Sequence, residues 1–157
     1  MLHGWLNDPA VVRWWEGDDV SWSGVVRDYS EATRGPEEHH IALDDGLPIG
    51  WIQSFELAFA PDEAESWIAA GADPSIIGID YLIGAAEDRG RGVGSSMISA
   101  FVRDVVFPRH PACAQVGADP DVDNRASCGA LARAGFRHLA DVPGKDGPGR
   151  LMVLDRG

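Results

Sequence analysis

Short runs of apolar residues, separated by glycine, proline and acidic residues, predict a series of β-strands along this chain. The run from Ile76 to Ile83 is almost continuously apolar and is interrupted by Gly78 and one charged residue, Asp80, a pattern typical of a buried central strand. Asp45-Gly46 favours a type I′ hairpin turn, because both central residues of that turn need a positive φ. The predicted strands are 38–43, 49–59, 76–83, 113–118, 136–142 and 150–154.

Capping residues and apolar spacing predict helices between these strands. Asp8-Pro9 has the pattern of an N-cap followed by proline at the first helical position and opens a short helix through Trp15. Asp123 is the predicted cap of a helix that Gly135 closes. Gly24 weakens the prediction of a helix at 21–29, because glycine disfavours the interior of a helix. The predicted helices are 9–15, 21–29, 62–70, the segment after Ser96 to about Phe107, and 124–134.

This order of elements combines hairpins with strand–helix–strand crossovers, which predicts an α+β fold around one mixed, mostly antiparallel sheet. The chain has 157 residues, a length that fits one domain, and it shows no internal repeat or interdomain linker. We therefore expect a single domain that spans residues 1–157.

The charge of the chain is strongly negative, −12 at pH 7, and it is unevenly distributed. Residues 1–85 carry 16 acidic residues and 3 arginines, whereas residues 86–157 are close to neutral. Such a chain repels nucleic acid and anionic membranes and suits a cationic partner. The alternative reading of the acidic residues is a solvated surface that keeps the protein soluble.

Several other classes of protein are excluded. No apolar run reaches the roughly 18 residues of a membrane helix, and the N-terminus lacks a signal-peptide pattern, so we expect a cytoplasmic protein. Cys113 and Cys128 are too few for a disulfide scaffold, and no zinc-ligand spacing is present. No metal is expected.

The segment from Arg89 to Ser96 is rich in glycine, follows a predicted strand and opens a helix. The N–H groups and dipole at a helix N-terminus attract anions, and glycine lets a phosphate approach the backbone. The segment has neither the Gly-Lys-Ser/Thr of a Walker loop nor the position of a Rossmann fingerprint. It is interpreted as a phosphate cradle, with a purely structural turn as the alternative.

Arg89-Gly90-Arg91-Gly92-Val93-Gly94 resembles the Arg/Gln-x-x-Gly-x-Gly/Ala pyrophosphate loop of the GNAT family of acyl-CoA-dependent N-acyltransferases. The segment from Asn124 to Phe136 is similar to that family's second signature, an Asn-containing helix start followed by Ala-Gly-Phe. From about Trp5 to Val153 the chain further resembles bacterial aminoglycoside 6′-N-acetyltransferases. That likeness is carried by Trp14-Trp15, Pro48-Ile49-Gly50, Gln53-Ser54, Asp73-Pro74, Gly78-Ile79-Asp80, Asp119-Pro120 and Asp146-Gly147-Pro148.

The resemblance implies acetyl transfer from acetyl-CoA to the 6′-amine of an aminoglycoside, or to another polyamine, by a monomer or homodimer. It implies a cofactor site made of Ile83, Arg89, Gly90, Arg91, Gly92, Val93, Gly94, Ser95 and Asn124. It also implies that aromatic faces (Trp15, Trp67) and carboxylates (Glu65, Asp80, Asp119, Asp146) bind the polycation, as charge-assisted bonds and ring contacts allow. The alternatives are core packing for the tryptophans, a turn for Asp119 and a hairpin residue for Asp146.

Asp80 is the expected catalytic residue. Burying a carboxylate without a partner costs several kcal/mol, so this strand is expected to present Asp80 to a cleft. The resemblance implies that Asp80 faces and orients the reacting amine, which attacks the thioester directly while backbone N–H groups polarise the carbonyl. An ion pair with Arg91 or Arg125 is the alternative.

Two features depart from the family pattern. Leu131 stands where the family usually has a tyrosine that protonates the departing thiolate, and Cys128 lies one turn earlier. The family's first strand precedes the helix that holds Trp5-Leu6-Asn7, so we expect that strand to be missing here. The alternatives to aminoglycoside acetylation are a GNAT enzyme for a siderophore lysine or a polyamine, and a catalytically idle protein that binds acyl-CoA or a cationic ligand. Siderophore enzymes usually carry histidine where Asp80 stands.

Overall fold

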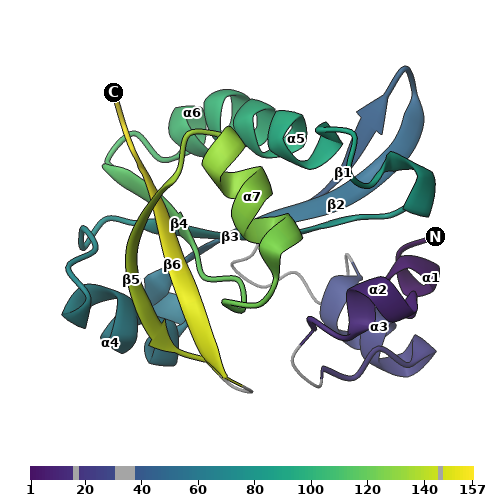
Figure 1. The fold of residues 1–157 in the computed structure, drawn as a ribbon, viewed down its shortest axis with the longest axis horizontal. Helices are drawn as coiled ribbons and strands as arrows, with labels where there is room; N and C mark the ends of the chain where they lie inside the picture. The colour runs from purple at the N-terminus through teal and green to yellow at the C-terminus, as the bar shows by residue number, and fades with distance from the viewer. Residues whose placement is uncertain (16–17, 31–37, 145–146) are drawn as a thin grey trace.

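A six-stranded sheet forms the centre of the computed structural model, which describes residues 1–15, 18–30, 38–144 and 147–157 (Figure 1). The strand order is β1-β2-β3-β4-β6-β5, and every pairing is antiparallel except that of β3 with β4. The strands are β1 (Glu38–Asp44), β2 (Leu47–Glu56), β3 (Ile77–Ile83), β4 (Gln115–Ala118), β5 (Arg137–Pro143) and β6 (Pro148–Asp155). The mixed sheet flanked by helices confirms the predicted α+β class.

The β1–β2 hairpin turns at Asp45-Gly46, as the sequence predicted. Asp45 and Gly46 have φ of 47° and 81°, so both central residues are in the left-handed region that a type I′ turn requires. The predicted second strand was too long, because β2 ends at Glu56 and a 3₁₀ turn, η2 (Leu57–Phe59), follows. This turn buries Leu57 in the core and leaves Phe59 exposed before α4 begins at Pro61.

Strands β3 and β4 diverge shortly after they meet. Their pairing consists of Ile77 with Val116 and Gly78 with Gly117, whereas β3 pairs with β2 along its whole length. From Ile79 to Ile83, the edge of β3 that faces away from β2 therefore has no strand beside it in the described part of the chain. This opening in the sheet is where the functional cleft lies.

One face of the sheet is covered by α5 (Val93–Phe101), a π-helical turn η4 (Val102–Val106), α6 (Phe107–Arg109) and α7 (Arg125–Arg133) (Figure 1). Their apolar side chains form one core with the sheet, which includes Ile52, Ile79, Ile98, Val116 and Leu131. Asn124, and not the predicted Asp123, caps α7. Because the helix begins at Arg125, it is the Asn124 side chain that accepts from the N–H of Ser127, at 3.1 Å.

The opposite face carries two separate groups of helices. Helices α1 (Leu2–Leu6), α2 (Pro9–Val12) and α3 (Trp22–Tyr29) pack on Trp51 and Leu82, whereas α4 (Pro61–Ala69) packs near Leu151 and Val153. Helix α2 is shorter than predicted, since Trp14 and Trp15 continue it only through bonds to Val11 and Val12, three residues back. The sheet surface between the two groups is left for polar residues.

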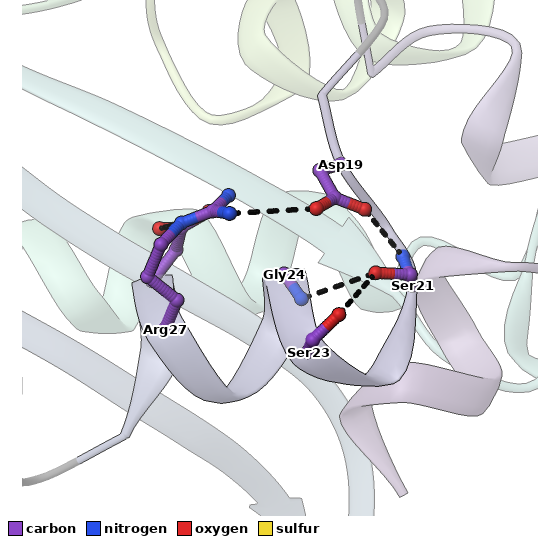
Figure 2. Close-up of polar contacts among 6 residues, drawn as sticks. Asp19, Ser21, Ser23, Gly24 and Arg27 are labelled. Carbon is purple, nitrogen blue, oxygen red and sulfur yellow. Dashed lines mark hydrogen bonds and ion pairs between the residues drawn. The ribbon is translucent and has the colours of Figure 1, made fainter.

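Helix α3 tolerates Gly24 because the chain before the helix folds tightly against it (Figure 2). A Cβ on Gly24 would lie 1.9 Å from the backbone oxygen of Asp19, so only glycine fits there. The Ser21 hydroxyl caps the helix by accepting from Gly24 N–H, and Asp19 accepts from the Ser21 N–H and pairs with Arg27 (Figure 2). Close packing therefore requires the same glycine that weakened the prediction of this helix.

Candidate active site

A single continuous cleft of about 1470 Å³ reaches from the glycine-rich loop before α5, past the open edge of β3, to α4. Acidic residues line much of it: Asp18, Asp62, Glu63, Glu65, Asp80, Asp88, Asp119, Asp121 and Asp141. Two arginines, Arg89 and Arg133, are the basic residues among the described residues of its lining. The cleft therefore has an acidic end suited to cations and a glycine-rich end suited to an anion.

Asp80 lies on the sheet surface between the two helix groups. Strand β3 places Leu82 under α1–α3 and Gly78 under the ring of Phe55, and Asp80 falls between them on the same face. Its carboxylate is exposed in the cleft and accepts a 2.7 Å hydrogen bond from the amide of Gln53, its neighbour across the β2–β3 pairing. The ion-pair alternative named Arg91, and the Arg91 guanidinium pairs with the Asp88 carboxylate at 3.5 Å.

Three aromatic side chains form one wall of the cleft beside Asp80. The Trp15 Nε1–H donates to the Tyr29 hydroxyl at 3.1 Å, and the Trp15 and Tyr29 rings each contact Trp51 edge-on. Burial, together with the charges of Asp18 and Asp80, raises the pKa of Tyr29 to about 12. Sequence reasoning found Trp15 but missed Tyr29 and Trp51. Trp51 could have been selected from the sequence, because it stands two residues before Gln53 and therefore lies on the same face of the strand.

Trp67 does not offer a ring face to the cleft. It is fully buried in the core beneath α4, and its Nε1–H donates to the Asp119 carboxylate at 3.1 Å. Asp119 is half-buried and does line the cleft, directly after β4. The structure thus assigns Trp67 the core-packing role that the sequence left open, and adds that it holds a cleft carboxylate in place.

Helix α4 contributes further carboxylates to the cleft. Glu65 is exposed and lines the cleft from α4, together with Asp62 and Glu63, which the sequence reasoning did not select. Asp146 lies outside the described residues. Asp121 and Asp141 also line the cleft.

The glycine-rich loop has the backbone that an anion site needs. Gly90 and Gly92 have φ of 76° and 84°, which disfavour any residue with a Cβ, and Gly92 is the N-cap of α5. No side chain among the described residues caps this helix, so its first N–H groups have no side-chain acceptor there. Of the predicted cofactor residues, Ile83, Arg89, Gly90, Gly92, Gly94 and Asn124 line the cleft, and Arg91, Val93 and Ser95 lie outside its lining.

Arg89 is held by protein groups. Its guanidinium donates to the backbone oxygens of Ile83 and Gly84 and to the Asp8 carboxylate, at 3.3, 2.8 and 2.9 Å. The bond from Arg89 is the main cause that holds the pKa of Asp8 below its usual value. Because Asp8 caps α2, Arg89 ties the glycine-rich loop to the helix group that carries Trp15.

The position of Leu131 is a core position. Leu131 is fully buried against α5, and Cys128 is half-buried, donates weakly to the Asp121 backbone oxygen and lies outside the cleft lining. Among the described residues, no cluster of three metal-ligating side chains occurs, and no helix has the length and apolarity needed to cross a membrane.

Comparison with known families identifies the fold. The sequence model of an acetyltransferase (GNAT) domain matches residues 1–143. The chain belongs to the GNAT acetyltransferase family. This membership confirms the predicted enzyme class, an acetyl-CoA-dependent N-acetyltransferase.

The chain is 31% identical over 160 residues to aminoglycoside N(6′)-acetyltransferase type 1 of Klebsiella pneumoniae, covering 99% of the chain and 77% of that protein. It is 30% identical over 94 residues to a kanamycin resistance protein of Rhizobium radiobacter, covering 60% of the chain and 85% of that protein. Among solved structures, the aminoglycoside acetyltransferase AAC(6′)-Ib with coenzyme A and kanamycin superposes with a TM-score of 0.82 at 28% identity, covering 99% of this chain and 88% of that one.

Proposed function

We propose that this chain transfers the acetyl group of acetyl-CoA to the 6′-amine of aminoglycoside antibiotics and thereby confers resistance to them. The observation that carries the proposal is Asp80, an exposed carboxylate at the middle of a cleft whose one end is acidic and aromatic and whose other end is a glycine-rich helix N-terminus. A polycation and an anionic cofactor therefore meet beside one carboxylate. We further propose that residues 1–157 act as one domain.

The cofactor end fits a pyrophosphate group. Gly90 and Gly92 bring no Cβ to the loop, and the uncapped start of α5 supplies N–H groups and a favourable dipole. Ile83 at the end of β3, Gly94 on α5 and Asn124 at the cap of α7 extend this site. Arg91 is exposed beside the loop and is available to a phosphate, whereas Arg89 positions the loop.

The acceptor end fits an aminoglycoside, which carries several ammonium groups on sugar rings. Glu65, Asp80 and Asp119 come from three separate elements and offer charge-assisted acceptors. Trp15 and Tyr29, which pack on the buried Trp51, offer aromatic surface for the apolar faces of the rings. The role of Trp67 as the residue that positions Asp119, and the predicted contact of Asp146 with the substrate, belong to the same proposal.

In the proposed mechanism, Asp80 binds the substrate ammonium, and Gln53 fixes the orientation of the carboxylate. The ammonium loses a proton to Asp80, directly or through water, and its nitrogen attacks the thioester carbonyl; the C–S bond then breaks and coenzyme A leaves as the thiolate. Backbone N–H groups on the open edge of β3 stabilise the oxyanion that forms. A carboxylate is a weak base toward an ammonium ion, so the main contribution of Asp80 is orientation of the amine.

The test is thiol release from acetyl-CoA with kanamycin or tobramycin as acceptor. Asp80→Asn removes a charge-assisted bond of about 1.5–3 kcal/mol, so kcat/KM should fall by roughly 10- to 150-fold. Asp104→Asn is the matched control, because Asp104 is exposed, pairs with Arg103 and lies outside the cleft lining. Turnover of lysine derivatives or polyamines alone would contradict the aminoglycoside assignment, and NMR of the product identifies the acetylated amine.

A monomeric or homodimeric state, a cytoplasmic location and the use of other polyamines stay predictions. An idle binding protein would bind acetyl-CoA tightly and turn over no amine in the same assay.

A further inference from the structure

Tyr81 is the residue after Asp80 on β3, and its hydroxyl group reaches across to α7. The Tyr81 hydroxyl lies 2.6 Å from the Ser127 Oγ and 3.4 Å from the Ser127 backbone oxygen. Both residues line the cleft. Burial is the main cause that raises the pKa of Tyr81 above its usual value, and the neighbouring Cys128 and Asp80 act in the same direction. The phenol therefore keeps its proton at neutral pH.

The two neighbours Asp80 and Tyr81 lie on opposite faces of the sheet. Successive side chains of a strand alternate, so Asp80 lies on the face of α4, whereas Tyr81 packs against the core beneath α5 and α7. Between them runs the edge of β3 that has no β4 partner beyond Gly78 in the described residues. A carbonyl bound at this edge has a carboxylate on one side and a phenol on the other.

Acetyl transfer requires a group that stabilises the departing sulfur. An amine that approaches from Asp80 pushes the leaving group toward the opposite face, where α7 begins. Leu131 on that helix is buried, and its side chain has no acidic proton to donate. Among the described residues that line the cleft on this face, Tyr81 and Ser127 carry hydroxyl groups.

We propose that the Tyr81 hydroxyl donates its proton to the departing thiolate of coenzyme A, with Ser127 orienting the phenol and returning a proton to it from solvent. This inference rests on the proposed acetyl transfer. As the C–N bond forms and the C–S bond breaks, the electron pair of the C–S bond moves to sulfur and the phenolic proton follows. The proton lost by the amine leaves through Asp80 or water, which balances the proton that restores the phenol.

Two variants separate proton donation from a structural tie, because each removes the 2.6 Å contact between the Tyr81 hydroxyl and the Ser127 Oγ, while Ser127→Ala leaves the phenol its 3.4 Å contact with the backbone oxygen of residue 127. Tyr81→Phe should lower kcat by about 10²-fold with little change in either KM, as expected for the loss of an acid in the transition state. Ser127→Ala keeps the phenol and should lower kcat by only about 3-fold, within the worth of one hydrogen bond. Equal losses of kcat and equal shifts of Tm in both variants would overturn the proposal.

A binding measurement tests the same contact without turnover. A phenol that donates to sulfur stabilises the thiolate, so the pKa of the thiol in bound coenzyme A, followed by thiolate absorbance, should rise by about 1 unit in Tyr81→Phe and stay unchanged in Ser127→Ala. An unchanged thiol pKa in Tyr81→Phe would refute the contact. Because coenzyme A alone is the probe, this result is independent of whether aminoglycosides are the acceptors: failure of the proposed function would instead appear as wild-type protein that turns over none of them.

Discussion

Replacing Trp67 with phenylalanine should destabilise the protein more than the lost volume explains, because the indole N–H holds a cleft carboxylate. Trp67 is fully buried and donates to Asp119 at 3.1 Å. Indole exceeds phenyl by roughly 40 Å³, which at about 24 cal/mol per Å³ of cavity costs about 1 kcal/mol. A hydrogen bond to a charged group adds about 1.5–3 kcal/mol. We therefore expect the free energy of unfolding to fall by about 2.5–4 kcal/mol.

Trp51→Phe is the matched control. Trp51 is also buried, at 2% exposure, but its Nε1 has no hydrogen-bond partner among the described residues. That substitution leaves a similar cavity and at the same time removes a buried N–H that lacks an acceptor, a relief of about 1–3 kcal/mol. Its net effect on the free energy of unfolding should lie near zero or be slightly stabilising.

Urea unfolding of both variants measures the difference directly, provided that the m-value is unchanged. For Trp67→Phe, we also expect KM for the aminoglycoside to rise while kcat changes little, since Asp119 loses its orientation but the reacting groups stay in place. Equal destabilisation of the two variants would refute the reasoning, because it would show that the bond to Asp119 contributes nothing measurable.

Three further predictions concern the loop and the aromatic wall. Gly92→Ala forces a residue with a Cβ to a φ of 84°, at a cost of about 1–2 kcal/mol, and calorimetry should show weaker binding of coenzyme A. Asp8→Ala removes both the cap of α2 and the bond to Arg89, so Tm should fall and coenzyme A binding should weaken; in the wild type, acidification below the lowered pKa of Asp8 should have the same effect on binding. The buried, protonated form of Tyr29 stabilises the fold below pH 10, and this contribution should be lost as the pH rises toward 12; Tyr29→Phe should flatten that part of the stability curve in urea unfolding.

Features that depend on local backbone geometry could be predicted from the sequence. The Asp45-Gly46 turn follows from positive φ values, which few residue types adopt, whereas the helix predicted after Ser96 begins earlier, at Val93. The central strand was recognisable because its apolar run has the length and continuity of a buried strand. The cap of α7 was missed by one residue, since Asp123 and Asn124 are both good caps and only the start of the helix distinguishes them.

Roles that depend on contacts between distant segments could not be predicted. Trp15 and Trp67 are equivalent in a sequence pattern, yet one lies in the cleft wall and the other is buried against Asp119, 52 residues away. The position of Arg89 in the glycine-rich motif predicts a phosphate ligand. In the structure its guanidinium instead donates to the carboxylate of Asp8, 81 residues earlier, and so connects two segments of the protein.

The sequence by itself determined the family, the glycine-rich loop and the presence of Asp80 on a central strand, because these are properties of consecutive residues. The tertiary structure alone decided that β3 and β4 part after Gly78, that two helix groups leave Asp80 exposed between them, and that Tyr81 meets Ser127 on the other face. The physical reason is that exposure and hydrogen-bond partners are set by which segments pack together. That packing is settled by the summed burial of three apolar clusters, to which residues from the whole chain contribute.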